Sequence, residues 1–323
     1  MNLTKYSIGI GDRFAHQALA QLRAVEDALK YGAEITPVWN KSYREHKTIG
    51  SEPEETRLQA DNAVKILKWD RSYFVDADHI NMENVELFIE HSDFFTIDVV
   101  DFIGTVVSEE KQESFFSWSE AYLGELKIPG IATAYKITIP FIIELAEKYL
   151  GAAEEALKIY DHIARVKGKA NFVTEVSMDE VEVAQSPIEL FFILGMLRNI
   201  TLQTFAPKFT GEFLKGIDYV GDLKQFEKEF DEVLFVLDYA KEEFDLPREL
   251  KLSIHTGSDK FRLYPIINML MKKHDQGIHL KTAGTTWLEE LNGLSISGEY
   301  GLSMAKDIYA QAFNRFNELS GPY

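Results

Sequence analysis

Short runs of β-branched and aromatic residues alternate with amphipathic stretches along almost the whole chain. Such runs predict strands, and apolar residues at helical spacing between them predict helices. Eight strands are expected, at Tyr6–Ile10, Ile35–Trp39, Tyr73–Ala77, Phe94–Asp98, Asn171–Val176, Thr201–Phe205, Lys251–His255 and Gly277–Thr282. Alternation of strands with helices favours a parallel sheet, and eight units favour a closed (β/α)8 TIM-like barrel over an open doubly wound sheet.

The segment between the fourth and fifth expected strands is much longer than an ordinary βα connection. Residues from about 105 to 168 contain apolar residues at helical spacing, which predicts an insertion of two or three helices. A chain of 323 residues fits one barrel, and no Gly/Ser linker, low-complexity tract or repeat marks a boundary. We therefore expect a single barrel domain over residues 1–323.

Charge and cysteine content exclude several functions. The chain has 34 Lys and Arg against 52 Asp and Glu, a formal net charge of −18, which disfavours nucleic acid and membrane surfaces as partners. It has no cysteine, so any metal must be held by His, Asp and Glu. No leader pattern and no apolar run of about 18 residues is found, so we expect a cytoplasmic protein.

Polar side chains end or follow the expected strands. In a parallel barrel these positions meet at one face, where the βα loops build the functional site. A single Asp after a strand is more often a helix cap, and a lone His more often a packing residue, so only their convergence predicts a pocket. The residues concerned are Arg13, Asn40, Lys41, Arg44, Asp76, Asp78, His79, Asp98, Glu175, Lys208, His255, Lys260, His279 and Lys281.

Glu175, His255 and His279 form the best candidate metal site in this set. Two imidazoles and one carboxylate with open coordination positions suit Zn²⁺, Mn²⁺, Ni²⁺, Co²⁺ or Fe²⁺. These residues are far apart in the sequence, so they can form one site only if the chain folds as the expected barrel. Asp78 and His79 are alternative ligands, or an acid/base pair.

Common cofactor and nucleophile motifs are missing from the sequence. The stretch GIGDRF lacks the third glycine of a dinucleotide fingerprint, and there is no G-x-x-x-x-G-K-[ST] phosphate loop. No G-x-S-x-G elbow supports a serine hydrolase.

Several strings around the strand ends point to one family: SIGIGDRF, TPVWNKSYREH, YFVDADHI, FFTIDVVDFIG, LSIHTGSDKFRLYPII and HLKTAGTTWLEEL. They resemble the tagaturonate epimerase family, bacterial enzymes that interconvert tagaturonate and fructuronate, and the resemblance runs from near the start to about residue 310. It implies a sugar epimerase that depends on a divalent metal ion and acts on a small sugar acid. This agrees with the metal site inferred from position alone.

The implied substrates set a chemical problem. The inverted carbon lies two bonds from the ketone, so simple enolisation cannot invert it. We favour retro-aldol cleavage, rotation of the aldehyde and re-addition, with a metal as Lewis acid, over transient oxidation of the hydroxyl. Asp78, His79 or Asp98 would move the hydroxyl proton, and Lys281 would stabilise the enolate or the carboxylate.

Substrate binding is assigned to Arg13, Asn40, Lys41, Arg44, Lys208 and Lys260. Arg13 or Arg44 would pair with the substrate carboxylate, because arginine binds carboxylates in a bidentate manner. Alternatives remain open: a metal-dependent sugar isomerase or aldolase of another specificity, or a barrel that only binds a sugar acid. An oligomer is also possible.

The third expected strand should end at Ala77. Strand side chains alternate in direction, so Asp78 and His79 can both face the pocket only if the strand has already ended.

Overall fold

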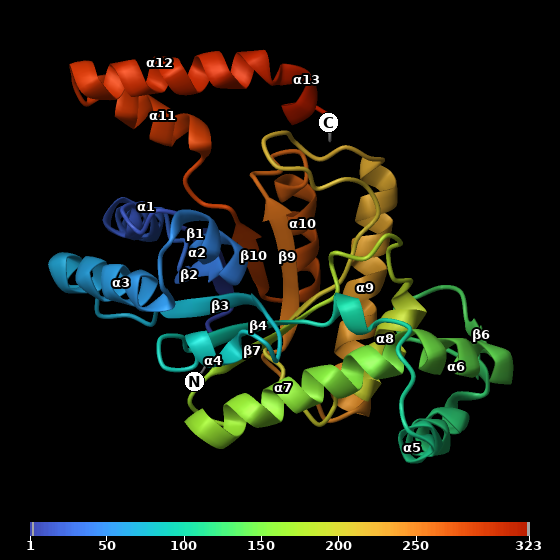
Figure 1. The fold of residues 1–323 in the computed structure, drawn as a ribbon. Coiled ribbons are helices and arrows are strands. Elements are labelled where there is room, and N and C mark those ends of the chain that lie inside the picture. The colour runs from blue at the N-terminus through green and yellow to red at the C-terminus, as the bar shows by residue number, and fades with distance from the viewer. Residues whose placement is uncertain (2, 322–323) are drawn as a thin grey trace.

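Eight parallel strands close into a barrel surrounded by helices in the computed structural model, which describes residues 1 and 3–321 (Figure 1). The strands are β1 (Tyr6–Gly11), β2 (Thr36–Ser42), β3 (Phe74–Ile80), β4 (Phe94–Asp98), β7 (Val173–Ser177), β8 (Thr204–Ala206), β9 (Lys251–Gly257) and β10 (Ile278–Thr282). Their order around the barrel is β1-β10-β9-β8-β7-β4-β3-β2. The TIM-like barrel is confirmed, and the ends of its strands differ from expectation by at most three residues.

Helices cover the outside of the barrel. Those outside the insertion and the C-terminal segment are α1 (Ala18–Lys30), α2 (Tyr43–Ile49), α3 (Pro53–Leu67), α4 (Val85–Phe88), η1 (Val100–Phe102), α8 (Pro187–Met196), α9 (Leu223–Glu243) and α10 (Tyr264–His274). Capping boxes start α2, where Ser42 pairs with Glu45, and α8, where Ser186 pairs with Glu189. These caps fix where the chain turns from a strand end or loop into a helix.

The insertion between β4 and β7 contains a small sheet as well as helices. Its elements are α5 (Glu109–Ser119), η2 (Glu120–Tyr122), β5 (Gly124–Leu126), β6 (Tyr135–Ile137), α6 (Ile139–Leu145), η3 (Ala146–Leu150) and α7 (Gly151–Lys167). The helices agree with expectation, but the antiparallel pair β5 and β6 was missed because three residues are too few to show periodicity. Aromatic contacts such as Trp118 with Phe192 pack the insertion against α8.

The interior of the barrel changes from apolar to polar along its axis. Leu3, Val38, Phe74, Phe94 and Val173 form a buried apolar cluster near the amino ends of the strands. The layers above it contain buried polar and charged side chains, which are Asp76, Thr96, Glu175, Thr204, Ser253, His279 and Lys281. Large branched apolar residues usually fill such a barrel. Buried charges are costly unless they are paired, so these side chains must form a connected network.

Strand β3 does not end at Ala77 but continues to Ile80, so that expectation was wrong. The pairing of β3 with β4 shifts register between Ala77 and Ile80, and His79 adopts a positive φ of 54°. Such a bulge inserts an extra residue and redirects the neighbouring side chains. Asp78 and His79 can therefore turn to the same side even though they are consecutive strand residues.

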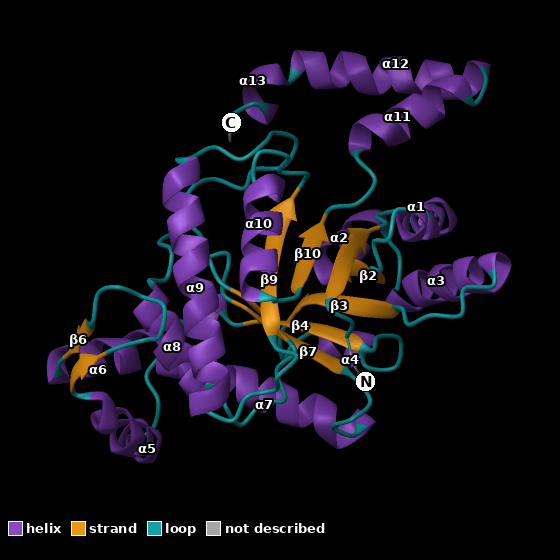
Figure 2. Cartoon of the chain, turned by 180° about the vertical axis from the view of Figure 1, so that it is seen from behind, coloured by secondary structure: helices purple, strands orange, loops and turns teal. Residues whose placement is uncertain are grey.

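The C-terminal helices α11 (Trp287–Ile296), α12 (Glu299–Asn314) and α13 (Phe316–Leu319) lie beyond the end of the barrel toward which β9 and β10 point (Figure 2). Tyr300, Tyr309 and Phe313 are largely exposed there. Within the described residues, no helix has the length and apolar composition needed to cross a membrane.

Gly9 of β1 allows another side chain to cross the barrel. A Cβ at this position would lie 2.8 Å from Lys281 Cγ and 3.3 Å from the Lys281 backbone. We expect Gly9→Ala to lower the free energy of unfolding by about 1–3 kcal/mol, as overpacking of a core does. Urea denaturation measures this change. Gly293→Ala is the control, since its Cβ meets no atom within 4 Å; equal stability of the two variants would contradict the prediction.

Candidate metal centre and active site

A cavity of about 300 Å³ lies at the carboxyl ends of the strands, where a TIM barrel carries its functional site. Its ionisable lining residues are Arg44, Glu45, Asp78, His79, Asp179, Glu180, Lys208, Glu212, Lys215, His255 and Lys281. The predicted convergence of acids, imidazoles and cations at this face is therefore present.

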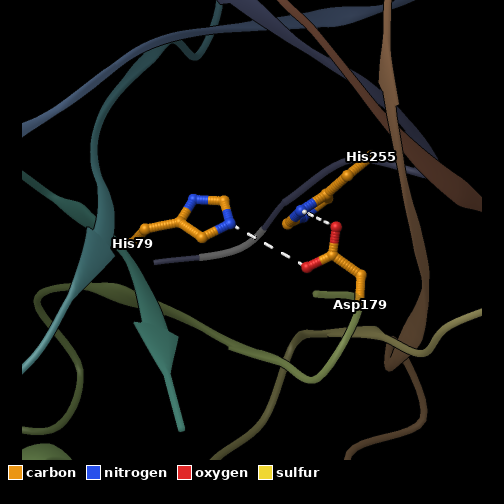
Figure 3. A group of neighbouring side chains, drawn as sticks. All are labelled: His79, Asp179 and His255. Carbon is orange, nitrogen blue, oxygen red and sulfur yellow. Dashed lines mark ion pairs between the residues drawn. The ribbon is translucent and has the colours of Figure 1, made fainter. Parts of the chain in front are cut away.

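Three side chains converge in this cavity (Figure 3). His79 comes from β3, His255 from β9 and Asp179 from the loop after β7. Their ligand atoms lie within 4.8 Å of one another. His255 Nδ1 lies 3.1 Å from Asp179 Oδ2, and His79 Nε2 lies 3.9 Å from Asp179 Oδ1. We call these residues the His79–Asp179–His255 trio.

The trio has the features expected of a site for a divalent metal ion. His79 Nε2 and His255 Nδ1 are buried, and neither has a hydrogen-bond partner among the described residues. Buried polar atoms without a partner are rare and need an explanation. Two such nitrogens beside one carboxylate form a donor set that suits Zn²⁺, Mn²⁺, Fe²⁺, Co²⁺ or Ni²⁺.

The other nitrogen of each imidazole binds a buried carboxylate. His79 Nδ1 lies 2.7 Å from Asp78 Oδ1, and His255 Nε2 lies 2.8 Å from Glu175 Oε1. A carboxylate behind a histidine ligand orients the ring and makes the opposite nitrogen more basic. Both rings are therefore held with their unpartnered nitrogens toward Asp179.

A buried lysine joins the two supporting carboxylates. Lys281 Nζ lies 2.7 Å from Asp76 Oδ2, 2.6 Å from Asp78 Oδ1 and 3.5 Å from Glu175 Oε1. It also donates a hydrogen bond to Thr96 Oγ1 at 2.6 Å. One ammonium thus faces three carboxylates in the barrel interior. We call Lys281, Asp76, Asp78, Glu175 and Thr96 the Lys281 cluster.

These contacts control the pKa values of the cluster. Burial alone would raise the pKa of Asp78 and Glu175, but Lys281 and the adjacent imidazoles outweigh it and hold both values below the ordinary range. Burial, assisted by the neighbouring carboxylates, raises the pKa of Asp76 to about 7 in spite of Lys281. Asp78 and Glu175 are therefore anionic at neutral pH.

The two imidazoles lie in a field that favours positive charge. Burial opposes protonation of His255, yet Asp179 and Glu175 raise its pKa to about 9. The pKa of His79 is also raised, because Asp78 and Asp179 outweigh its burial. The cavity floor thus attracts a cation, either protons or a metal ion.

The predicted ligands Glu175, His255 and His279 do not meet as a metal site. Among the described residues they do not form a group with all ligand atoms within 4.8 Å. Glu175 lies behind His255, and His279 lies deeper in the barrel, with its Nδ1 2.8 Å from Ser7 Oγ. Burial, together with cationic neighbours, lowers the pKa of His279 to about 3. The structure favours the alternative ligand His79, and Asp179, as companions of His255.

Of the predicted catalytic residues, Asp78, His79 and Lys281 line the cavity. Asp98 ends β4 but is not among the lining residues that the structure describes, and its Oδ1 accepts a hydrogen bond from the Val100 N–H at 3.1 Å. Burial raises the pKa of Asp98, with Glu180 and Asp179 acting in the same direction. Asp98 therefore lies close enough to sense the charges of the trio.

Of the residues predicted to bind substrate, Asn40, Arg44 and Lys208 line the cavity. Asn40 Oδ1 is buried and has no hydrogen-bond partner among the described residues. Lys215 was not anticipated but adds another cation to the lining.

The other three predicted substrate-binding residues are not among the lining residues that the structure describes. Lys41 alternates with Asn40 on β2, so its side chain leaves the barrel interior and donates to Ser51 Oγ at 2.7 Å. Lys260 is buried in its own loop and donates to Leu214 O at 3.0 Å. Arg13 pairs with Glu45 at 3.2 Å and is not part of the described lining.

Asp179 is a candidate site residue that was not predicted from the sequence. It lies in SMDE, two residues after the end of β7, and accepts a hydrogen bond from Ser177. The expected strand ended at Val176, one residue before β7 ends, and Glu175 was the acid predicted from it. Acidic residues shortly beyond a barrel strand were the available signal, and a longer window after each strand would have included Asp179 and Glu180.

Both the sequence and the fold match known proteins. The sequence model of the tagaturonate epimerase family matches residues 1–323. This chain belongs to the tagaturonate epimerase family. The tagaturonate/fructuronate epimerase of Thermotoga maritima is 31% identical over 333 aligned positions, which cover 97% of this chain and 63% of that protein. The chain thus spans less than two thirds of this relative's length.

Crystal structures of the fructuronate-tagaturonate epimerase of Cohnella laeviribosi share the fold of this family member. The native structure and a glycerol complex both match with a TM-score of 0.80 at 24% sequence identity. The match covers 100% of this chain and 65% of theirs. The barrel with its insertion therefore occurs in solved structures.

The trio yields a direct binding prediction. Replacing His255 or His79 with Ala removes one of three ligands, so we expect the affinity for Co²⁺ or Zn²⁺ to fall by at least about 100-fold. Isothermal titration of the metal-stripped chain measures it. His162→Ala is the control, because His162 lies on the outer helix α7 and pairs with the exposed Glu86. Equal metal affinity of all three variants would contradict the trio as the site.

Proposed function

We propose that this chain is a metal-dependent epimerase that interconverts tagaturonate and fructuronate. The observation that carries the proposal is the pair of unpartnered imidazole nitrogens beside Asp179 in the cavity of a tagaturonate epimerase family member. The Thermotoga maritima relative bears the name of this activity. The cavity also combines the cations and acids that an anionic sugar would need.

His79, Asp179 and His255 would hold the divalent ion. When bound, the ion supplies a Lewis acid that polarises the ketone of the substrate and stabilises negative charge on the enolate. Asp78 and Glu175 orient the two imidazoles for this task through their hydrogen bonds, and a bound ion would take the place of the proton that these carboxylates otherwise favour.

Inversion two bonds from the ketone requires the neighbouring C–C bond to break and re-form. Loss of the hydroxyl proton turns that hydroxyl into an aldehyde, and the electrons of the broken C–C bond move into the enolate. After the aldehyde rotates, the enolate carbon adds to its other face and the proton returns to oxygen. No external oxidant or reductant is needed.

We assign the proton transfer to Asp98 and Glu180. They lie on neighbouring parts of the barrel, at the end of β4 and in the loop after β7. Glu180 lines the cavity with its Oε1 4.0 Å from His79 Nε2, and burial raises the pKa of Asp98, which favours a carboxyl group that can take up and return a proton. Asp78 and His79 are the other candidates from the sequence. In this proposal His79 is a metal ligand and Asp78 orients its ring, so neither is assigned the proton transfer.

We assign binding of the sugar acid to the cationic residues that line the cavity. Arg44, Lys208 and Lys215 supply positive charge there, although the chain as a whole is acidic. Arg44 can hold a carboxylate in a bidentate manner. The unpartnered Oδ1 of Asn40 offers an acceptor for a sugar hydroxyl.

Product analysis tests this function. The chain loaded with metal is incubated with tagaturonate, fructuronate, a neutral ketose and a phosphorylated sugar, and products are followed by NMR. We expect the two uronates to interconvert, with deuterium on the inverted carbon retained and with a small isotope effect. Asp98→Asn and Glu180→Gln should lower kcat by about 10²–10⁴-fold. Glu182→Gln, an exposed acid of the same loop, is the control.

Each other outcome identifies a different function. Preference for the neutral or phosphorylated sugar would mean an isomerase of another specificity, and release of fragments would mean an aldolase. Binding of the uronate without turnover would mean a sugar-acid-binding barrel. A large primary isotope effect from the deuterium would show that the C–H bond breaks, which contradicts the retro-aldol route.

A further inference from the structure

We infer that Lys281 is a positioning residue that holds both imidazoles of the metal centre in place through one ammonium group, and that it does not act on the substrate. The inference rests on the proposed metal site at the His79–Asp179–His255 trio. It concerns the layer below that site, where the Lys281 cluster fills the barrel interior.

Each supporting carboxylate uses the same oxygen for its imidazole and for Lys281. Asp78 Oδ1 lies 2.7 Å from His79 Nδ1 and 2.6 Å from Lys281 Nζ. Glu175 Oε1 lies 2.8 Å from His255 Nε2 and 3.5 Å from Lys281 Nζ. A shift of the ammonium therefore moves both oxygens that set the two rings. One lysine links two carboxylate–histidine pairs.

Lys281 reaches these partners across the barrel. It belongs to β10, whereas Asp78 is on β3 and Glu175 on β7, and neither of those strands neighbours β10 in the barrel. The absence of a side chain at Gly9 leaves the space that the lysine chain occupies. The ammonium thus fixes two separate parts of the barrel wall relative to one another.

The donors of Lys281 are already used inside the protein. An ammonium has three N–H donors. Asp76 Oδ2, Asp78 Oδ1 and Thr96 Oγ1 lie at 2.7, 2.6 and 2.6 Å from Nζ, so these three contacts occupy them. No close donor remains for an enolate or a carboxylate of the substrate.

The charge state of Lys281 also excludes a covalent role. Burial lowers the pKa of a lysine, but Asp76, Asp78 and Glu175 together raise that of Lys281 above its ordinary value. A Schiff base requires the neutral amine. The lysine stays protonated as the counter-ion of the cluster, and the substrate-stabilising role expected from the sequence is replaced by a positioning role.

Thr96 of the cluster and the neighbouring Thr204 add hydrogen bonds to the carboxylates. Thr96 Oγ1 lies 3.2 Å from Glu175 Oε1 and 3.0 Å from both oxygens of Asp76, while Thr204 donates to Glu175 Oε2 at 2.7 Å. Glu175 Oε2 is thus held independently of the lysine. Loss of Lys281 would release Asp78 more than Glu175, so the ring of His79 should respond more strongly than that of His255.

The test compares metal binding by the full-length chain and its variants. Lys281→Met alone leaves three carboxylates without a counter-ion and is expected to fold poorly. Combining it with Asp76→Asn removes one ammonium and one carboxylate, so the formal cluster charge of −2 is unchanged (three carboxylates and one ammonium become two carboxylates). Co²⁺ is the probe, since its visible absorption reports coordination geometry and chelator competition gives its affinity.

We expect K281M/D76N to fold, to bind Co²⁺ about 10–100-fold more weakly and to show an altered Co²⁺ spectrum, as loss of a supporting hydrogen bond to a histidine ligand does. Gly9→Ala, which displaces Lys281 without removing a charge, should weaken binding in the same direction. Lys251→Met is the matched control: Lys251 is also buried in β9, but it donates to the backbone of Thr4 and Lys5 and should change affinity less than threefold.

Two failures can be told apart. If the wild type binds Co²⁺ with an affinity that His255→Ala does not alter, the proposed metal site fails, and this inference falls with it. If His255→Ala abolishes binding but K281M/D76N and Gly9→Ala keep the wild-type affinity and spectrum, only the positioning role of Lys281 is overturned. Should the double variant not fold, the Gly9→Ala result decides between these outcomes.

Discussion

The buried ammonium of Lys281 lies among Asp76, Asp78 and Glu175 in the middle of a barrel that other sequences fill with branched apolar side chains. Moving charges out of water costs several kcal/mol per ion, and only close pairing with further hydrogen bonds offsets that cost. Thr96 supplies such hydrogen bonds, and Gly9 supplies the space. The polar interior thus depends on Lys281, because removing its ammonium leaves three buried carboxylates without their shared counter-ion.

This unit explains why the cavity above it can hold a cation. Asp78 and Glu175 stay anionic next to Lys281, and each uses the same oxygen to orient an imidazole. Asp179 then faces two buried nitrogens, at 3.1 Å from His255 Nδ1 and 3.9 Å from His79 Nε2, and neither nitrogen has a hydrogen-bond partner among the described residues. The apolar cluster around Phe94 closes the barrel below. The barrel interior thus has three successive layers: the apolar cluster around Phe94, the charged Lys281 cluster, and the donor atoms of the His79–Asp179–His255 trio.

Charge is distributed unevenly between the whole molecule and the cavity. The formal net charge of −18 disfavours nucleic acid, yet Arg44, Lys208 and Lys215 line the cavity together with His79, Asp179 and His255. An anionic sugar would meet local positive charge despite the acidic average. Net charge describes the average surface, whereas the ligand chemistry of the cavity depends on the few charged residues that line it.

The sequence was sufficient for the barrel but not for the details of its mouth. All eight barrel strands of the described chain were anticipated, because the alternation of strands and helices is a strong periodic signal. The direction of a side chain near a strand end depends on single residues, and the bulge at His79 has no such signal. His79 was therefore predicted only as an alternative ligand. His279 was predicted to lie at the cavity, but it lies deeper in the barrel, next to Ser7. Asp179 was not predicted, because it lies two residues beyond the end of β7.

The central claim is that a divalent ion binds at the His79–Asp179–His255 trio above the Lys281 cluster. Its most direct test is a crystal structure of the metal-loaded chain with anomalous scattering recorded at the absorption edge of the metal. We predict one anomalous peak within about 2.0–2.3 Å of His79 Nε2, His255 Nδ1 and an Asp179 oxygen. A peak bonded to Glu175 and His279 instead, with His79 left unligated, would contradict the account.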